Sequence, residues 1–386
     1  MNPLAVGLIV LSLGTFFALA QFKVVPNMGE IVGFLGIRPG QIPFMMSLFT
    51  VFGIFLSIPT GGLIQRFGPK MIVMTASAVL IIGSVIGGFA QNSAVMLASR
   101  AVEGVGNAFM AVAGTAMVAT YTRPEKIGRA MGIWVCWVAL GQIIGFNLTP
   151  VLFGVMDWHN IWFIYASVTL LAALLVLITM KLPVSVTAAQ PSKVSAEKLS
   201  LSSVFKNRNL MLAGIGFSGF NALILGLLTW IVSYQEGLLG LTQASFMASI
   251  PMIGCLVAGP FYGNLSIKIG CKKLFMLGIT GASVGFILAF TTAIPVIYIG
   301  VIIFGLIGLS TPAMAFSSVP GLVGDPRYIG MGSGIMNTFQ GLGMFLGSQF
   351  FPNFVALGGN QFVGALIFAV LVGLIALICL GLAKFR

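Results

Sequence analysis

Three charged residues stand inside long apolar stretches of the sequence, and they are the residues best suited to do chemistry. They are Lys23, Arg100 and Glu103. A lysine or arginine at the centre of a membrane-spanning helix costs about 2.5 to 3.5 kcal/mol on insertion scales, so such residues usually have a function. Two cations and one carboxyl group could hold a small anion and carry a proton.

Arg100 and Glu103 belong to a polar stripe on one predicted helix. Arg100 lies about 12 Å below the outer end of its apolar segment, too deep for its side chain to reach the interface easily. Arg100, Glu103, Asn107 and Thr115 fall within an arc of about 120° on a helical wheel. We therefore expect the stripe to face a cavity. The alternative is a local pair, in which Arg100 and Glu103 neutralise each other and only fix helix packing.

Lys23 stands closer to the end of its segment. If the first span ends near Met28, Lys23 is about 7 Å from the outer interface, and its ammonium group could snorkel to the headgroups. Gln21, Pro26 and Asn27 add polarity and a break that a lipid-facing helix does not need, and Asn27 would share the face of Lys23. We favour a cation that faces a cavity and keep snorkelling as the alternative.

The second half of the chain carries neutral hydrogen-bonding groups at helical spacing. Ser218, Asn221 and Thr229 share one helix face with Trp230 beside them, and a second stripe contains Ser333, Asn337, Gln340 and Ser348. Interhelical hydrogen bonding and substrate contact both explain such stripes. Cations on one side of a cavity and neutral donors on the other suit a small anion. The candidate substrate-binding residues are Lys23, Arg100, Gln21, Asn27, Asn107, Asn221, Trp230, Asn337 and Gln340, with Glu103 as the proton carrier.

The elements that must position these residues are membrane-spanning helices. Of 386 residues, 58% are apolar and only 7% are charged, whereas a soluble domain has about 25% charged residues. The sequence therefore predicts an all-α integral membrane protein. Division at polar and Gly/Pro positions gives twelve spans, at 4–28, 42–64, 71–90, 94–118, 130–154, 160–181, 209–234, 244–265, 274–291, 294–316, 331–355 and 360–383.

An internal repeat divides these twelve spans into two parallel six-helix halves. A polar connector at 183–207 separates an N-terminal half, 1–182, from a C-terminal half, 208–386. A constant offset of 202 residues pairs glycines of one half with glycines of the other, including Gly141 with Gly343 and Gly145 with Gly347. These small-xxx-small pairs predict close helix packing, and sliding at that contact is a second hypothesis.

The distribution of basic residues predicts the orientation. When loops are assigned alternately to the two sides, 16 of the 19 lysines and arginines fall on one side and Arg38 alone on the other. Cytoplasmic loops carry the excess of Lys and Arg. Both chain termini are therefore expected in the cytoplasm, in a bacterial-type inner membrane.

Two loops at the repeat offset resemble a known motif. They read Gly61-Gly62-Leu63-Ile64-Gln65-Arg66-Phe67-Gly68-Pro69-Lys70 and Gly263-Asn264-Leu265-Ser266-Ile267-Lys268-Ile269-Gly270-Cys271-Lys272. Both are similar to the cytoplasmic loop motif of the major facilitator superfamily, and the resemblance covers the whole chain. Gln65 and Ile267 replace the acid of that motif, which weakens the charge-based latch it provides. The resemblance implies a gating role, with membrane topology alone as the alternative, for Gly61, Arg66, Gly68, Lys70, Gly263, Lys268, Gly270 and Lys272.

Two further resemblances refine this identification. Gln21 to Pro26 look most like bacterial permeases of the cyanate-permease type. Arg100 and Gly104 match an Arg-x-x-x-Gly pattern in the fourth span, which in the superfamily is linked to coupling or substrate binding. Nitrate and nitrite porters use arginines in spans 2 and 8, and 42–64 and 244–265 contain none, which argues against that branch.

Other functions lack their motifs. The sequence has no phosphate-cradling loop for ATP, its four cysteines are far apart, and its one histidine, His159, lies in an outer loop. We therefore expect no enzyme activity, no cofactor, no metal and no nucleic acid, and a monomer that meets a small anionic substrate, protons and membrane lipids.

The predicted function is secondary active transport of a small organic or inorganic anion by alternating access, with proton coupling or exchange. One rival is a proton-coupled efflux pump for hydrophobic compounds, which 32 Phe and 20 Met would suit. The other is a membrane sensor or assembly factor that transports nothing.

Overall fold

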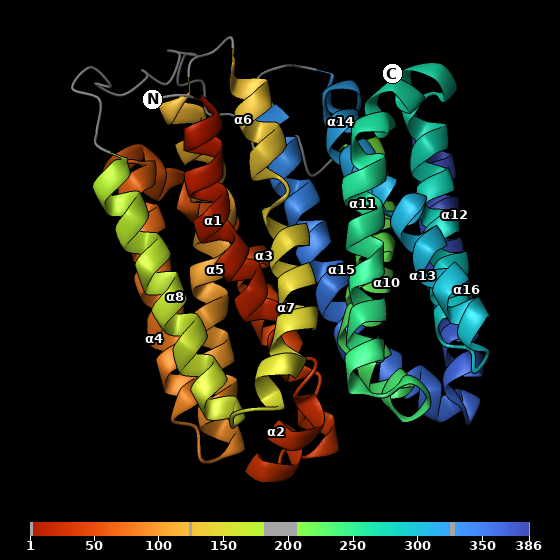
Figure 1. Ribbon diagram of the computed structural model, residues 1–386. Helices are drawn as coiled ribbons and strands as arrows, with labels where there is room; N and C mark the ends of the chain where they lie inside the picture. Colours follow the sequence, from red (N-terminus) through yellow and green to blue (C-terminus); the bar gives the residue numbers. More distant parts are fainter. Residues whose placement is uncertain (1–2, 123–125, 181–206, 325–328, 386) are drawn as a thin grey trace. The chain divides into compact units, whose positions relative to one another are not determined.

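The computed structural model describes residues 3–122, 126–180, 207–324 and 329–385, and these residues form helices joined by short turns (Figure 1). The chain divides into two compact units, Met1–Gln190 and Pro191–Arg386. The predicted connector at 183–207 lies outside the described residues except for Asn207, so its boundaries stay a prediction.

Unit 1 is a bundle of long helices with two short ones, α2 and α6, of which α2 lies at the end opposite the N-terminus (Figure 1). Its elements are α1 Pro3–Phe22, α2 Met28–Leu35, η1 Pro39–Gln41, α3 Phe44–Phe67, α4 Pro69–Gly88, α5 Ser93–Tyr121, α6 Ile127–Trp134, α7 Trp137–Phe153 and α8 Trp158–Thr179. Helix α5 packs against both α3 and α4, while α1 packs against α7.

Unit 2 has the same kind of bundle. Its elements are α10 Arg208–Leu239, α11 Leu241–Ile269, α12 Cys271–Ala289, α13 Ile294–Leu306, η3 Gly308–Ser310, α14 Thr311–Val323, α15 Ile329–Gly358 and α16 Gln361–Leu382. Helix α10 lies at its core and packs against α15 and α16.

Glycine allows the closest helix contacts in both units. A Cβ on Gly141 of α7 would clash with the Thr15 carbonyl oxygen of α1, and one on Gly343 of α15 would clash with the Ser218 carbonyl oxygen of α10. The two glycines are 202 residues apart, so the repeat makes the same helix contact twice. The predicted close packing at these glycines is confirmed.

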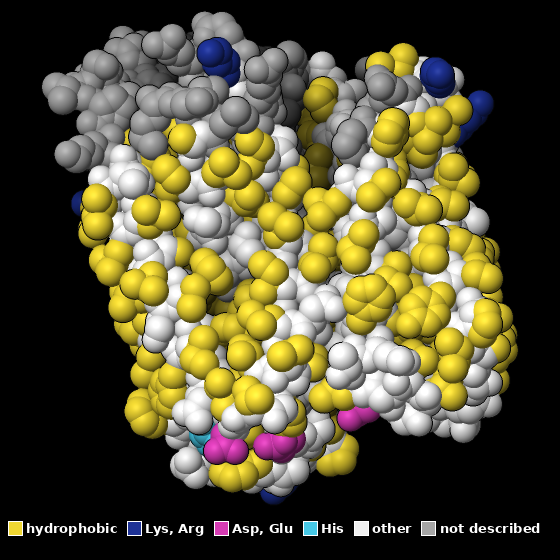
Figure 2. All heavy atoms as spheres, viewed as in Figure 1, with side chains coloured by type: hydrophobic (Ala, Val, Ile, Leu, Met, Phe, Trp, Pro, Cys, Tyr) yellow, Lys and Arg dark blue, Asp and Glu magenta, His cyan; other side chains and the backbone are white. Residues whose placement is uncertain are grey.

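The membrane-spanning architecture is also confirmed. Eleven segments of the described chain are long and apolar enough to cross a membrane, and they correspond to eleven of the twelve predicted spans. The remaining prediction, 331–355, lies on α15, a helix of 30 residues. Figure 2 shows apolar side chains over the flanks of each unit, with acidic side chains gathered at one end.

Three predicted spans are interrupted in the structure. The first was expected to run from 4 to 28, but α1 ends at Phe22 and residues 23–27 form turns before α2. Pro26 explains this break, because proline has no N–H to donate and disfavours a helical conformation at Val25. The predicted span 130–154 is divided between α6 and α7, and 294–316 is divided between α13, η3 and α14.

Candidate functional site

The three in-span charges meet in the interior of unit 1. Arg100 and Glu103 lie one turn apart on α5, and Lys23 is the first residue after α1. All three side chains are 0% exposed, and they are the buried charged side chains of the described residues. We call Lys23, Ser84, Arg100 and Glu103 the charge cluster.

The Glu103 carboxylate is the centre of the charge cluster. Its Oε1 accepts a hydrogen bond of 2.7 Å from Lys23 Nζ and one of 2.5 Å from Ser84 Oγ. Its Oε2 accepts one from Arg100 Nη1. Gly83 of α4 makes room for this side chain, because a Cβ there would lie 2.7 Å from Glu103 Cγ. Both carboxylate oxygens are therefore held by protein donors.

Arg100 is fixed by the end of α1. A helix leaves its last four carbonyl groups without helical partners. The Leu19 and Phe22 oxygens accept from the Lys23 and Val25 backbone N–H groups at 2.9 and 3.1 Å. The Ala20 and Gln21 oxygens accept from Arg100 Nη1 and Nη2 at 2.9 and 3.0 Å.

A further contact joins Arg100 to α3. Its Nε donates to the Met45 carbonyl oxygen at 2.8 Å, and the guanidinium lies 4.6 Å from the centre of the Phe49 ring. One side chain thus ties α5 to the end of α1 and the beginning of α3. The break after Phe22, which shortens the first span, is what frees the carbonyl groups that Arg100 binds.

Lys23 does not snorkel, so that alternative is wrong. Its Nζ is buried between Glu103 and Ser84, at 3.0 Å from Ser84 Oγ, and lies 4.4 Å from the centre of the Trp162 ring. The alternative of a local pair between Arg100 and Glu103 is incomplete, because Lys23 also contacts Glu103. Arg100 and Glu103 are paired, but Lys23 joins them and leaves the cluster with a formal net charge of one positive unit.

Only part of the polar stripe on α5 is tested by the structure: Arg100 and Glu103 are enclosed by packed helices, and a cavity beside Asn107 and Thr115 stays a prediction. Arg100 and Glu103 point into the packed interior of unit 1, Asn107 is half-buried, and Thr115 accepts a hydrogen bond of 3.0 Å from Trp134 Nε1. Part of the stripe therefore holds helices together. In the same region, Gln21 is buried, and both side-chain amide atoms of Asn27 are buried without a partner among the described residues.

Unit 2 reproduces the packing around the charge cluster without charges. A Cβ on Gly83 would lie 2.8 Å from Glu103 N, and one on Gly285 would lie 2.8 Å from Phe304 N, so Phe304 takes the place of Glu103. At the repeat offset, Leu225 replaces Lys23 and Phe286 replaces Ser84. Leu225, Phe286 and Phe304 are buried and apolar. The bundle therefore does not need a charge cluster in order to pack.

Of the predicted binding residues of the second half, Trp230 joins two helices and Asn221 bonds to its own helix. Trp230 Nε1 on α10 donates to the Ser348 carbonyl oxygen on α15 at 2.9 Å. Asn221 Nδ2 donates to Phe217 of its own helix at 2.7 Å. Asn337 and Gln340 are half-buried on α15. Their contact with a substrate stays a prediction.

The two loop motifs form equivalent turns. Gly68 joins α3 to α4 with φ of +81°, and Gly270 joins α11 to α12 with φ of +89°, a region that favours glycine. Lys70 Nζ donates to the Leu177 carbonyl oxygen near the end of α8 at 2.9 Å, and Lys272 Nζ to Gly381 near the end of α16 at 2.7 Å. These lysines satisfy helix C-termini. Arg66 and Lys268 are exposed in the last turns of their helices.

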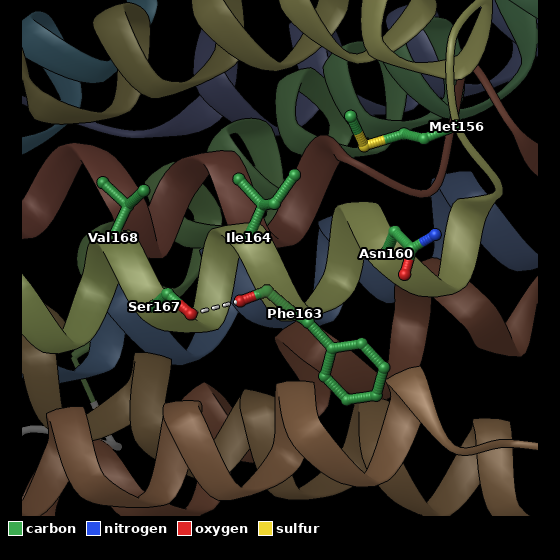
Figure 3. Close-up of a pocket in the computed structure, with 6 residues that line it drawn as sticks. All are labelled: Met156, Asn160, Phe163, Ile164, Ser167 and Val168. Atoms are coloured by element: carbon green, nitrogen blue, oxygen red, sulfur yellow. Dashed lines mark hydrogen bonds between the residues drawn. The ribbon is translucent and has the colours of Figure 1, made fainter.

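Ser84 is the member of the charge cluster that sequence reasoning missed. Its apolar neighbours on α4 gave no signal, because serine in a membrane helix usually bonds to its own backbone. Figure 3 shows a surface hollow of unit 1 that is lined by none of the cluster residues. Met156, Asn160, Phe163, Ile164, Ser167 and Val168 line it.

The sequence matches one family along almost its whole length. Residues 10–242 and 238–386 match the family model of the Major Facilitator Superfamily. The crystal structure of a variant of the nucleoside transporter NupG is similar, with a TM-score of 0.79 and 15% identity, over 98% of this chain and 100% of that chain. This likeness shows a shared fold.

The curated relatives carry different substrates in their names. The sialic acid transporter NanX of Escherichia coli is 26% identical over 82% of this chain and 80% of its own. The probable nitrate transporter NarT of Staphylococcus aureus is 24% identical over 92% of this chain and 89% of its own. The multidrug transporter mfsC of Aspergillus fumigatus is 32% identical over 39% of this chain, and the match spans only 29% of mfsC.

Proposed function

Because the chain belongs to the Major Facilitator Superfamily, we propose that this transporter moves a small anion across the membrane and couples its movement to protons. Transport by this family proceeds by alternating access. The charge cluster would hold the anion, and Glu103 would carry the proton.

The observation that carries the proposal is a net positive charge buried in unit 1. Removing charged groups from water costs several kcal/mol per ion, which a pair recovers only with good geometry. Two cations and one carboxylate leave one cation uncompensated within the cluster. Unit 2 packs equivalent helices with Leu225, Phe286 and Phe304 instead. We infer that unit 1 keeps its charges for binding and not for folding.

Charge balance gives a coupling scheme. With Glu103 ionised, Lys23 and Arg100 both contact its carboxylate, and the cluster has a net charge of one positive unit. Protonation of Glu103 raises that charge by one, and a monovalent anion lowers it again. One proton entering with one monovalent anion therefore leaves the buried charge unchanged. Names of the relatives NanX and NarT, which refer to sialic acid and nitrate, agree with an anionic substrate.

The test is uptake into proteoliposomes that contain the purified protein, with an inward proton gradient. Radiolabelled small anions should accumulate in wild type, and Glu103→Gln should exchange anions without accumulating them. Glu236→Gln, which changes an exposed acid of α10, is the matched control. Accumulation by Glu103→Gln at the wild-type level would contradict the assignment of Glu103 as proton carrier.

Efflux of hydrophobic compounds is the second candidate, and the similarity to mfsC favours it. It predicts that the same vesicles move a fluorescent hydrophobic dye under a proton gradient and do not accumulate anions. A sensor or assembly factor predicts neither flux. Measurement of dye and anion movement in one preparation separates the three.

A further inference from the structure

The geometry of the charge cluster points to a more specific substrate: we propose that the transported anion is a monocarboxylate. Its carboxylate group would take the place of the Glu103 carboxylate among Lys23, Ser84 and Arg100. This inference rests on the proposed function of anion transport.

The donors of the charge cluster are arranged for two oxygens of one planar group. Lys23 Nζ and Ser84 Oγ donate to Glu103 Oε1, while Arg100 Nη1 donates to Oε2. A substrate carboxylate presents the same pair of oxygens with the same charge. A spherical ion such as chloride can satisfy only one side of this arrangement.

For the substrate carboxylate to replace the Glu103 carboxylate, one of the two cations must stay in place and the other must move. Arg100 is held by the backbone oxygens of Ala20, Gln21 and Met45, so it is the fixed partner. Lys23 follows the last residue of α1 in a stretch of turns. The backbone there is not confined by helical hydrogen bonds on both sides. Lys23 is therefore the partner that can follow the substrate when protonated Glu103 releases it.

The same inventory of charges limits the substrate to one carboxylate. Among the described residues, Lys23 and Arg100 are the buried cations, and both are needed for the first carboxylate. A second carboxylate of a dianion would be buried without a cation of its own, which is unfavourable. Succinate and similar dianions should therefore bind far more weakly than monocarboxylates.

Ser84 sets the position of the exchanged group. Its hydroxyl has a single hydrogen, which it donates to the carboxylate, while its oxygen accepts from Lys23 at 3.0 Å. It thus orients the ammonium and the carboxylate toward each other. Ser77, about two turns earlier on α4, is also buried, but it donates to the Val73 carbonyl oxygen of its own helix at 2.8 Å. Ser77→Ala is therefore a matched control for Ser84→Ala.

The first experiment measures ligand-induced thermal stabilisation of the purified full chain. Glu103→Gln removes the competing carboxylate, so acetate, lactate, gluconate or benzoate should stabilise it to the same extent from pH 5 to 8. In wild type the same ligand should bind about tenfold more weakly for each pH unit once Glu103 is ionised. Chloride and succinate should have little effect. The inference is overturned if chloride stabilises the protein as strongly as the carboxylates do, or if none of the four carboxylates stabilises it.

The second experiment needs no Glu103 variant. Uptake of the stabilising monocarboxylate by Ser84→Ala vesicles should show a KM about tenfold higher and an optimum at higher pH, since the ionised carboxylate of Glu103 has lost a donor. Ser77→Ala should match wild type. Equal KM values and pH profiles for the two variants would overturn the inference.

The two proposals fail in different ways. If vesicles accumulate no anion of any kind, anion transport itself is wrong. If they accumulate nitrate or a dianion but no monocarboxylate, anion transport stands and the substrate assignment is wrong.

Discussion

Arg100 shows how one side chain depends on the end of another helix. The sequence predicted that Arg100 is too deep to reach the interface and needs a partner, and the structure supplies Glu103 and three backbone carbonyl groups. The sequence alone could not predict which backbone carbonyl groups are free to bind Arg100, because this depends on α1 ending at Phe22. The partners of Lys23 were not predictable either, since Ser84 and Glu103 are 61 and 80 residues away from it in the sequence.

Replacement of Arg100 by lysine should abolish most transport. The planar guanidinium reaches Met45, Gln21 and Glu103 in three directions, and an ammonium group cannot. We expect at least a tenfold loss in uptake and a lower melting temperature for Arg100→Lys. Arg208→Lys, at an exposed position of α10, should change neither. Wild-type uptake by Arg100→Lys would show that a point charge suffices.

Neutral variants of the charge cluster should differ in stability according to the charge they leave. Glu103→Gln leaves two buried cations, whereas Lys23→Gln leaves the neutral pair of Arg100 and Glu103. Removal of one partner from a buried ion pair costs about 3 to 5 kcal/mol. Glu103→Gln should therefore melt at a lower temperature than Lys23→Gln in the same detergent without added anion. The reverse order would contradict the charge balance described for the cluster.

At the scale of elements, sequence patterns located the spans well and their interruptions poorly. The length of the apolar segments identified the helices, because a helix must have about 20 apolar residues to cross the lipid. The break at 23–27 contains Lys23, Pro26 and Asn27, but it is short and Met28 and Ile31 follow it, so hydropathy averaged over a whole span continued the first span to residue 28. The divisions at α6/α7 and α13/η3/α14 are also invisible to hydropathy. At such breaks, tertiary packing compensates for the lost helical hydrogen bonds. Their positions therefore depend on contacts between helices, which a hydropathy profile does not contain.

The glycines of the two loop motifs should be irreplaceable for conformational reasons. Gly68 and Gly270 have φ of +81° and +89°, values that L-residues with a side chain rarely adopt. With ψ of 157° and 140°, both lie near an extended region that is essentially confined to glycine and costs another residue about 1 to 3 kcal/mol. We therefore expect Gly68→Ala and Gly270→Ala each to lower the melting temperature and impair transport. Gly62→Ala, inside α3 with open space around it, is the control and should be neutral. Equal melting temperatures for Gly62→Ala and Gly68→Ala would refute the turn argument.

At the scale of the whole molecule, the internal repeat and the restriction of in-span charges to the first half were both predictable from the sequence, but the residue that replaces Glu103 in the second half was not. Gly141 and Gly343 make the same contact in each unit, and Gly68 and Gly270 the same turn. Glu103 and Phe304 occupy equivalent positions, although Glu103 is charged and Phe304 is apolar. Alignment at one constant offset pairs Glu103 with Gly305 instead, so the replacement becomes visible only through the packing of Gly83 and Gly285.

The orientation of the molecule is the last prediction. Because 16 of 19 basic residues fall on one side of the predicted topology and cytoplasmic loops carry the positive excess, both termini and the connector at 183–207 should be cytoplasmic. Trypsin should therefore cleave at Lys193, Lys198 or Lys206 in inverted membrane vesicles and not in intact right-side-out cells. Cysteines introduced at exposed Gln91 and Glu236 test the opposite side, in a background without the native cysteines. An impermeant maleimide should label both in intact cells. Cleavage of the connector from outside, or protection of both cysteines there, would invert the topology and place every loop lysine on the wrong side.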